Sequence, residues 1–194
     1  MQQKQRDLAG LSWEDPRPLS IWLGDSHIEF GDWYNLFGGA LAVRNCGMAM
    51  ATIRDVTDLV KSIPDQRPKT VVIMCGINSI FRGESVEECV KDYEILLNEA
   101  HRSLHPQSLV VLAVMPVRIN PLDTRSQSIN QKVLKFNSML EMLCQKQGCC
   151  FLNIDASIEG ADGGLSVHLT DDGLHLNRKG YRAMATAIHP NLPK

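Results

Sequence analysis

Serine, histidine and aspartate residues stand in loops of this chain where together they could perform acyl transfer. Ser26 follows the apolar run at 21–23 and precedes an amphipathic stretch, so the sequence predicts it at a strand-to-helix turn. Asp172 and His175 lie three residues apart, just before another predicted helix. This spacing can bring the carboxylate against the imidazole Nδ1 and leave Nε2 as a base. A serine hydroxyl needs such a base because it is a weak nucleophile alone.

Groups that could stabilise a developing oxyanion follow three of the predicted strands. They are the backbone N–H groups of Ser26 and Gly47 and the side-chain amide of Asn78. A helix N-terminus at Ser26 would add unpaired N–H groups and a dipole that favours negative charge. Taken singly, these residues also suit helix caps and turns. Their occurrence together in separate loops predicts a serine nucleophile with its base, its orienting acid and its oxyanion donors.

Apolar runs and amphipathic stretches alternate along the chain. Runs that are apolar almost throughout are typical of strands buried on both faces, and their alternation with helices predicts a parallel sheet with right-handed crossovers. The predicted strands cover 17–24, 40–46, 70–76, 109–115 and 149–154, and the predicted helices cover 27–37, 52–62, 85–104, 127–147 and 178–189. Such sheets bind ligands at the carboxyl ends of their strands. The loops in which chemistry is expected are 24–27, 46–51, 76–84, 116–125 and 155–177.

The bulk composition fits one soluble domain. With 194 residues, of which 44% are hydrophobic and 22% charged, the chain suits a single domain over 1–194 with its core at about 19–189. A net charge of -2 gives no reason to expect nucleic acid. No apolar run approaches the roughly 20 residues of a membrane span, and the polar first residues do not resemble a signal peptide. The six cysteines form no C-x-x-C pair, so we expect reduced thiols and a cytoplasmic protein.

Neighbouring residues compete for the same roles. Asp171 adjoins Asp172 but stands four residues from His175, so Asp172 is the favoured partner. His27 adjoins Ser26, and we expect it to line the cleft or face solvent because neighbouring side chains on a helix point apart.

Other chemistries lack their motifs. The group His27, Glu29 and Asp32 has no zinc-type spacing such as H-E-x-x-H, so we expect no metal. No Walker loop or G-x-G-x-x-G occurs, so we expect no nucleotide and no other cofactor. The G-x-S-x-G turn of the α/β-hydrolases is absent as well. His168 is interpreted as an ordinary loop histidine.

Four sequence blocks occur in an order that a known family shares. They are Gly24-Asp25-Ser26, Asn45-x-Gly47, Gly76-x-Asn78 and Asp172-Gly173-Leu174-His175-Leu176-Asn177. With them, from about 19 to 189, the chain resembles the SGNH hydrolases, the GDSL esterase/lipase family. The resemblance implies a flavodoxin-like α/β/α sandwich of three layers with a five-stranded parallel sheet. It also implies hydrolysis of esters or thioesters without a metal.

The family roles transfer onto the matching positions. The resemblance implies Ser26 as the nucleophile, His175 as the base and Asp172 as its partner. It implies an oxyanion hole formed by Ser26, Gly47 and Asn78. Two positions depart from the family pattern: residue 27 is histidine instead of the leucine of the family name, and the block around Gly47 lacks the more polar turn of many members.

The expected substrate is a small-molecule ester. The loop at 115–122 follows the fourth predicted strand and should overhang the cleft, so Val117 is a candidate contact for an acyl chain. Arg118 either contacts an anionic group of the substrate or caps the protein surface. Asp25, Phe81 and Arg82 are the other candidate contacts. Because the short chain has no inserted lid, we expect a shallow cleft for small or short-chain acyl groups. The sequence carries no signal for an oligomeric state.

Two other functions fit the same residues. One is carbohydrate O-deacetylation, or acyl transfer to a sugar, with the same nucleophile. The other is a catalytically idle binding module, which the intact set of Ser26, Asn78, Asp172 and His175 disfavours. Serine-dependent turnover would exclude the binding module, and preference among ester classes would separate the two kinds of enzyme.

Overall fold

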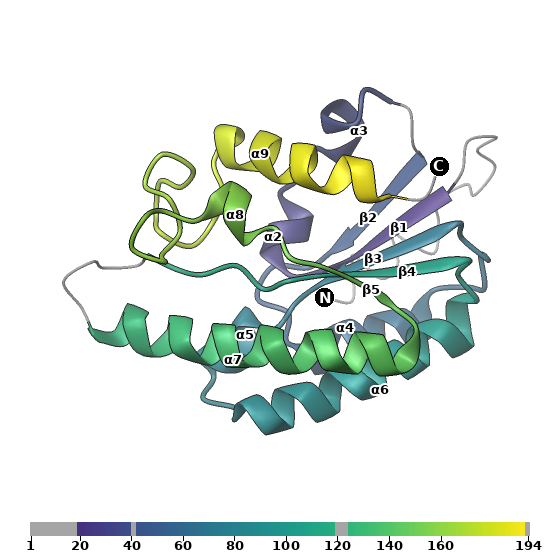
Figure 1. Cartoon of the computed structure of the whole chain (residues 1–194). Helices are drawn as coiled ribbons and strands as arrows, with labels where there is room; N and C mark the ends of the chain where they lie inside the picture. Colours follow the sequence, from purple (N-terminus) through teal and green to yellow (C-terminus); the bar gives the residue numbers. More distant parts are fainter. Residues whose placement is uncertain (1–18, 40–41, 119–123, 193–194) are drawn as a thin grey trace.

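A five-stranded parallel sheet forms the centre of the computed structural model, which describes residues 19–39, 42–118 and 124–192 (Figure 1). The strands are β1 (Leu19–Gly24), β2 (Ala42–Gly47), β3 (Thr70–Met74), β4 (Ser108–Leu112) and β5 (Cys150–Leu152). Their order across the sheet is β2-β1-β3-β4-β5, and each neighbouring pair is parallel. The predicted α/β fold is confirmed. Because β2 and β3 lie on opposite sides of β1, the sheet has a topological switch point between β1 and β3.

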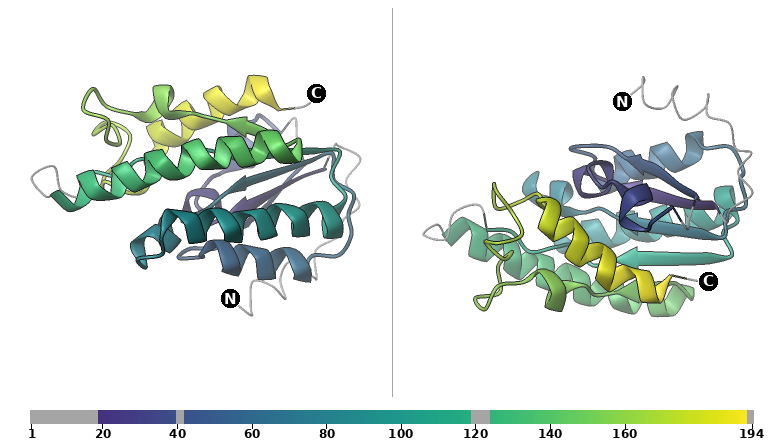
Figure 2. Two further views of the ribbon diagram at one scale, coloured as in Figure 1. Left: turned by 60° about the horizontal axis from the view of Figure 1, so that its bottom comes forward. Right: turned by 90° about the horizontal axis from the view of Figure 1, so that it is seen from above.

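Helices cover both faces of the sheet (Figure 2). One face carries α4 (Ile53–Ser62), α5 (Ile77–Phe81), α6 (Val86–Leu104) and α7 (Thr124–Gln147). The other face carries α2 (Ser26–Glu29), α3 (Trp33–Leu36), α8 (Asp155–Ile158), α9 (Arg178–Ile188) and the 3-10 helix η1 (His189–Asn191). None of the helices in the described part of the chain is long and apolar enough to cross a membrane.

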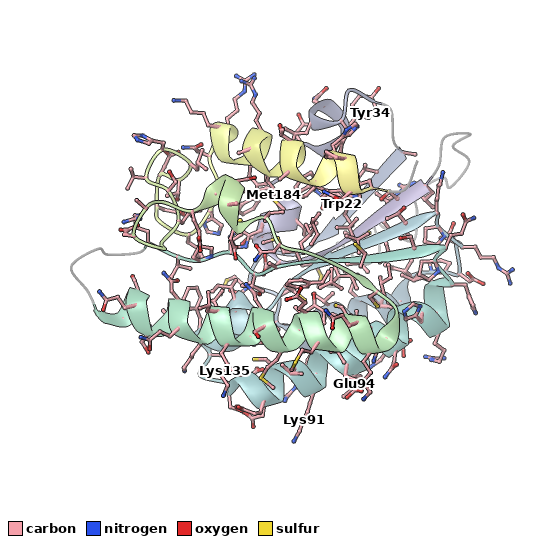
Figure 3. All side chains as sticks on the ribbon, viewed as in Figure 1. Trp22, Tyr34, Lys91, Glu94, Lys135 and Met184 are labelled. Carbon is pink, nitrogen blue, oxygen red and sulfur yellow. The ribbon has the colours of Figure 1, made fainter. Side chains whose placement is uncertain are left out.

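Alternate side chains of the central strands enter two different cores. In β1, Ile21 and Leu23 pack on the side of α4 and α6, whereas Trp22 packs on the opposite side with Met184 of α9 (Figure 3). The same alternation holds in β3 and β4. Because both faces of the sheet are covered, both sets of side chains must be apolar, and this explains the nearly continuous apolar runs.

Side-chain caps fix where α4 and α6 begin. Thr52 accepts a hydrogen bond from the backbone N–H of Asp55, and the Asp55 carboxylate accepts one from the N–H of Thr52. Ser85 and Glu88 exchange the same pair of bonds. These capping boxes satisfy N–H groups that a helix start leaves unpaired. Each helix therefore begins one residue after its predicted start.

The predicted helix at 27–37 is two short helices in the structure. Asp32 caps α3 by accepting the N–H of Asn35, which starts a new helix at Trp33. The carbonyl groups at the end of α2 accept hydrogen bonds from the side chain of Asn45 instead of from the backbone N–H groups of a further helical turn. The helices α5 and α8 were not predicted, and β5 is shorter than the apolar run at 149–154. The predicted strand residues 17–18 and 40–41 lie outside the described residues.

Candidate active site

The candidate residues gather at the carboxyl ends of β1, β2 and β3. Gly24, the last residue of β1, pairs with Gly47 of β2 and Met74 of β3. Ser26 follows β1 by two residues, and Asn78 lies in the first turn of α5, shortly after β3. The switch point of the sheet therefore brings three of the predicted loops together.

Two hydrogen bonds join Ser26 to Asp172 through His175. The Ser26 Oγ lies 3.1 Å from the His175 Nε2. On the other side of the ring, the His175 Nδ1 lies 2.6 Å from the Asp172 Oδ2. A carboxylate at this position favours the tautomer with a proton on Nδ1, which leaves the Nε2 lone pair facing the hydroxyl. The neighbouring Asp171 has a different partner, because its Oδ1 accepts from the Asn177 side chain at 3.4 Å.

The Asp172 carboxylate also organises the loop that carries His175. Its Oδ1 accepts the backbone N–H groups of Leu174 at 2.9 Å and of His175 at 2.7 Å. Partial burial would raise the pKa of this carboxyl, but hydrogen bonds from His175 and Leu174 outweigh burial and hold the pKa well below its usual range. Asp172 is therefore ionised near neutral pH, as a group that orients an imidazole must be.

Ser26 occupies the first position of α2, and Asp25 caps this helix. The Asp25 carboxylate accepts the N–H of His27 at 3.0 Å. The N–H of Ser26 has no hydrogen-bond partner among the described residues, as expected for the first turn of a helix. Gly24 lets the end of β1 lie close to the end of β3, because a Cβ at this position would lie 2.1 Å from the carbonyl oxygen of Met74.

Asn45 fixes the end of the serine turn, a role that the sequence did not predict. Its Nδ2 lies 2.9 Å from the carbonyl oxygen of Ile28 and 3.1 Å from that of Glu29. Its Oδ1 accepts the N–H of Gly47 at 3.0 Å. The sequence feature that could have indicated this role is the position of Asn45 near the end of a predicted strand, in the block Asn45-x-Gly47.

In the structure, Gly47 has a packing role and not the expected role of oxyanion donor. Its N–H is already bound to Asn45. A Cβ at this position would lie 2.2 Å from the backbone nitrogen of Glu29 and 2.7 Å from the carbonyl carbon of Ile28. The glycine therefore lets α2 pack closely against the end of β2.

The turn after β2 offers another unpaired backbone donor. Met50 has a φ of 64°, which is uncommon for a residue other than glycine, and its N–H has no partner among the described residues. The next residue, Ala51, accepts a hydrogen bond from the Asn78 Nδ2 at 3.0 Å. An amide nitrogen carries two hydrogens, so this bond leaves one Asn78 donor for a ligand.

Arg118 holds the loop that carries His175 instead of facing the cleft as a free cation. Its guanidinium binds the Asp162 carboxylate and donates from Nε to the carbonyl oxygen of Leu165 at 2.5 Å. Its backbone N–H donates to the carbonyl oxygen of Gly173 at 2.6 Å, next to Asp172. The expected anion contact is thus corrected to a support of the loop.

The other predicted substrate contacts separate into buried and exposed residues. Val117 is 1% exposed, and its backbone N–H is bound to the Asn130 side chain at 2.8 Å. Asp25 is 1% exposed as well, because its carboxylate binds His27 within the protein. Phe81 and Arg82 remain accessible at the end of α5. Residues 119–122 of the loop expected to overhang the cleft lie outside the described residues.

His27 is buried, contrary to the expectation that it lines the cleft or faces solvent. It is 2% exposed. Asp25 and the Leu174 carbonyl group lie within hydrogen-bond distance of its two ring nitrogens. Within the described residues, no group of three or more His, Cys, Asp or Glu side chains is placed to hold a metal ion.

An exposed aromatic ring borders the candidate base. Phe30 is 54% exposed, and its ring centroid lies 5.4 Å from that of His175. A pocket of about 570 Å³ lies beside this ring. Its lining includes Leu36, Leu176, Tyr181, Arg178 and Arg182. The surface next to His175 therefore combines apolar side chains with polar and charged ones.

Comparisons with known proteins agree on one family and fold. The model of the GDSL-like Lipase/Acylhydrolase family matches residues 20–183. Platelet-activating factor acetylhydrolase IB subunit alpha2 of Homo sapiens is 27% identical over 187 residues, which cover 92% of this chain and 78% of the relative. A GDSL-like lipase from Bacteroides thetaiotaomicron superposes with a TM-score of 0.80 at 17% identity over 98% of this chain and 95% of its own. A catalytic mutant of an acetylxylan esterase from Geobacillus stearothermophilus superposes with a TM-score of 0.72 at 16% identity over 89% and 93% of the two chains.

Proposed function

The chain belongs to the GDSL-like lipase/acylhydrolase family of ester hydrolases, and from this premise we propose that it hydrolyses esters or thioesters of small acyl groups through an acyl-enzyme on Ser26. The observation that carries the proposal is the hydrogen-bonded series of Ser26, His175 and Asp172. A nucleophile, a base within hydrogen-bond reach and a third group that orients the base are the parts that serine catalysis needs.

The proposed reaction has two acyl-transfer steps. The His175 Nε2 takes the proton of Ser26, and the Oγ attacks the acyl carbonyl carbon. The resulting tetrahedral intermediate collapses, and the alcohol or thiol leaves with the proton from His175. A water molecule then gives a proton to His175 and attacks the acyl-enzyme, and His175 passes the proton to the Ser26 Oγ as the carboxylic acid leaves. The Asp172 carboxylate stabilises the imidazolium that forms in each step.

The proposed oxyanion donors are the Ser26 N–H and the free amide hydrogen of Asn78. The unpaired N–H of Met50 is a third candidate in place of the occupied Gly47 N–H. Donors that are fixed before the reaction stabilise the negative charge without further reorganisation, and they act mainly on the transition state.

Replacing Asn78 by alanine should lower kcat by about 10²- to 10³-fold, with KM little changed. The reason is that the amide binds the developing oxyanion more strongly than the ground-state carbonyl oxygen. Steady-state kinetics on p-nitrophenyl acetate measure this effect. The matched control is Asn98→Ala at an exposed position on α6, which should leave both constants unchanged. A rise in KM at constant kcat would contradict the assigned role.

Two observations support a substrate with a small acyl group. The relatives described above include one named an acetylhydrolase and one named an acetylxylan esterase, so both names refer to acetyl esters. In this chain, Val117, which was expected to contact an acyl chain, is buried in the core. We expect kcat/KM to fall steadily along a p-nitrophenyl ester series from acetate to laurate. A maximum at the longer chains would overturn the small-acyl assignment.

A second candidate substrate is an acetylated sugar. The exposed ring of Phe30, together with polar and charged side chains of the adjacent pocket such as Asn35 and Arg178, suits a sugar ring with its hydroxyl groups. Turnover of acetylated xylose, compared with that of acetyl-CoA and p-nitrophenyl acetate, would separate the two candidate substrates. Transfer of the acetyl group to an added sugar would reveal acyltransferase activity.

The catalytically idle binding module has its own test. Absence of Ser26-dependent turnover on every ester, together with no labelling by a fluorophosphonate, would favour the idle binding module.

A further inference from the structure

The buried His27 ring lies between two hydrogen-bond acceptors. Its Nδ1 lies 3.0 Å from the Asp25 carboxylate, and its Nε2 lies 2.9 Å from the carbonyl oxygen of Leu174. An ionised carboxylate and a carbonyl oxygen accept hydrogen bonds and cannot donate them. A neutral imidazole carries one N–H, so it would leave a lone pair facing one of these acceptors. The imidazolium donates to both.

The charges around the ring favour the protonated state. Burial would lower the pKa of His27, but the charge and hydrogen bond of Asp25, helped by the Leu174 carbonyl and the charge of Asp172, raise it above its usual value. The imidazole ring of His175 lies nearby, with its centroid 5.7 Å from that of His27. This distance allows His27 to influence the base without a hydrogen bond to it.

Two further titratable side chains near Asp25 and His27 have raised pKa values, which favour their neutral forms. Tyr181 on α9 donates its hydroxyl to the carbonyl oxygen of His27 at 3.0 Å, and burial raises the pKa of this tyrosine. Cys75, which follows β3, has a pKa raised by its burial and by the charge of Asp25. The side chain that contacts the Asp25 carboxylate and can carry a positive charge is therefore that of His27.

We propose that His27 is a positioning residue, a buried imidazolium that ties the turn bearing Ser26 to the loop bearing His175. Asp25 and His27 flank the serine, and the carbonyl group of Leu174 belongs to the peptide that leads into His175. One cation thus fixes both sides of the 3.1 Å contact between the proposed nucleophile and base. This inference rests on the proposed function of that pair.

Substitution of His27 tests whether its two ring hydrogen bonds position Ser26 and His175. His27→Leu removes both donors, and we expect kcat on p-nitrophenyl acetate to fall by about 10- to 100-fold with KM little changed, as for other groups that orient a reacting residue. His27→Gln keeps one N–H donor within reach of the Leu174 carbonyl and should recover a large part of the loss. The matched control is His168→Gln, an exposed histidine of the same loop region, which should leave kcat unchanged.

The pH dependence gives a readout that a purely structural role would not move. Because the pKa of His27 is raised in the folded state, its stabilising contribution is complete below its ordinary pKa of about 6.5 and is lost as the pH rises through the folded value. The advantage of the wild type over His27→Gln, in kcat and in Tm, should therefore shrink as the pH rises. The glutamine amide does not titrate, so it serves as the reference.

Nitrogen-15 NMR of the wild-type protein tests the protonation state even where His27→Leu fails to fold. We expect both ring nitrogens of His27 to carry protons at pH 6 to 7, with the resonances identified by their loss in His27→Gln. A single protonated nitrogen, or a soluble His27→Leu with wild-type kcat, would overturn the proposal. These failures differ from failure of the proposed function, in which the wild type itself would show no Ser26-dependent turnover.

Discussion

Replacing Ser26 by alanine is expected to lower kcat on p-nitrophenyl acetate by about 10⁶-fold, the largest effect of any single substitution in this chain. The reason is that the Oγ of Ser26 is the atom that would form the acyl-enzyme, and the alanine methyl group cannot replace it. Labelling by a fluorophosphonate should be lost as well, because the same oxygen forms that bond. Stopped-time assays with high enzyme concentration and mass spectrometry of the labelled protein measure both losses.

A matched serine and a double variant serve as controls for this substitution. Ser138→Ala, at an exposed position on α7, should keep full turnover and full labelling. Adding His175→Ala to Ser26→Ala should cost little more, because a base without its nucleophile has no proton to take. Retention of labelling in Ser26→Ala would place the nucleophile elsewhere and refute the mechanism. A second loss as large as the first would mean that the two residues act independently.

Asp172→Asn should lower kcat by about 10⁴-fold, although it changes one oxygen to an NH₂ group. The amide would donate towards the His175 Nδ1, which favours the tautomer with its proton on Nε2. That proton would face the Ser26 hydroxyl, so the ring could no longer accept from it. The measurement is kcat for the purified variant, with circular dichroism to show that the fold is kept.

The adjacent aspartate supplies the control for this substitution. Asp171→Asn alters the same charge at the neighbouring position, but its carboxylate lies against Asn177 and not against the imidazole. We expect less than about a threefold change in kcat, because an exposed charge that does not contact the reacting groups contributes little. Equal losses in the two variants would mean that the negative charge of the loop matters rather than the orientation of His175.

The features predicted from sequence are those that depend on local patterns. The alternation of Ile21, Trp22 and Leu23 between two cores requires a run that is apolar throughout, so such a run predicts a buried strand without knowledge of its partners. Ser26 directly follows the turn after a predicted strand, and His175 lies in the loop that precedes the last predicted helix. Both positions belong at the edge formed by the carboxyl ends of the strands once the sheet is parallel.

The features that escaped prediction depend on partners far away in the chain. Arg118 resembles a free cation in the sequence until its loop meets Asp162 and Leu165. His27 resembles a surface residue until the Leu174 carbonyl group, 147 positions later, comes within reach of its ring. No local pattern encodes such contacts, because each depends on how two segments meet after the sheet has formed.

The distance along the chain between Ser26 and His175 also sets the order in which the site is made. The two residues are 149 positions apart, so a ribosome working at about 5 to 20 residues per second synthesises the serine roughly 7 to 30 seconds before the histidine. During that interval the nascent chain holds a serine without a base, and such a serine is a weak nucleophile. We therefore expect reactivity towards a fluorophosphonate to arise only after α9 and the preceding loop have docked. An activity-based probe would therefore report completion of the C-terminal part of the fold.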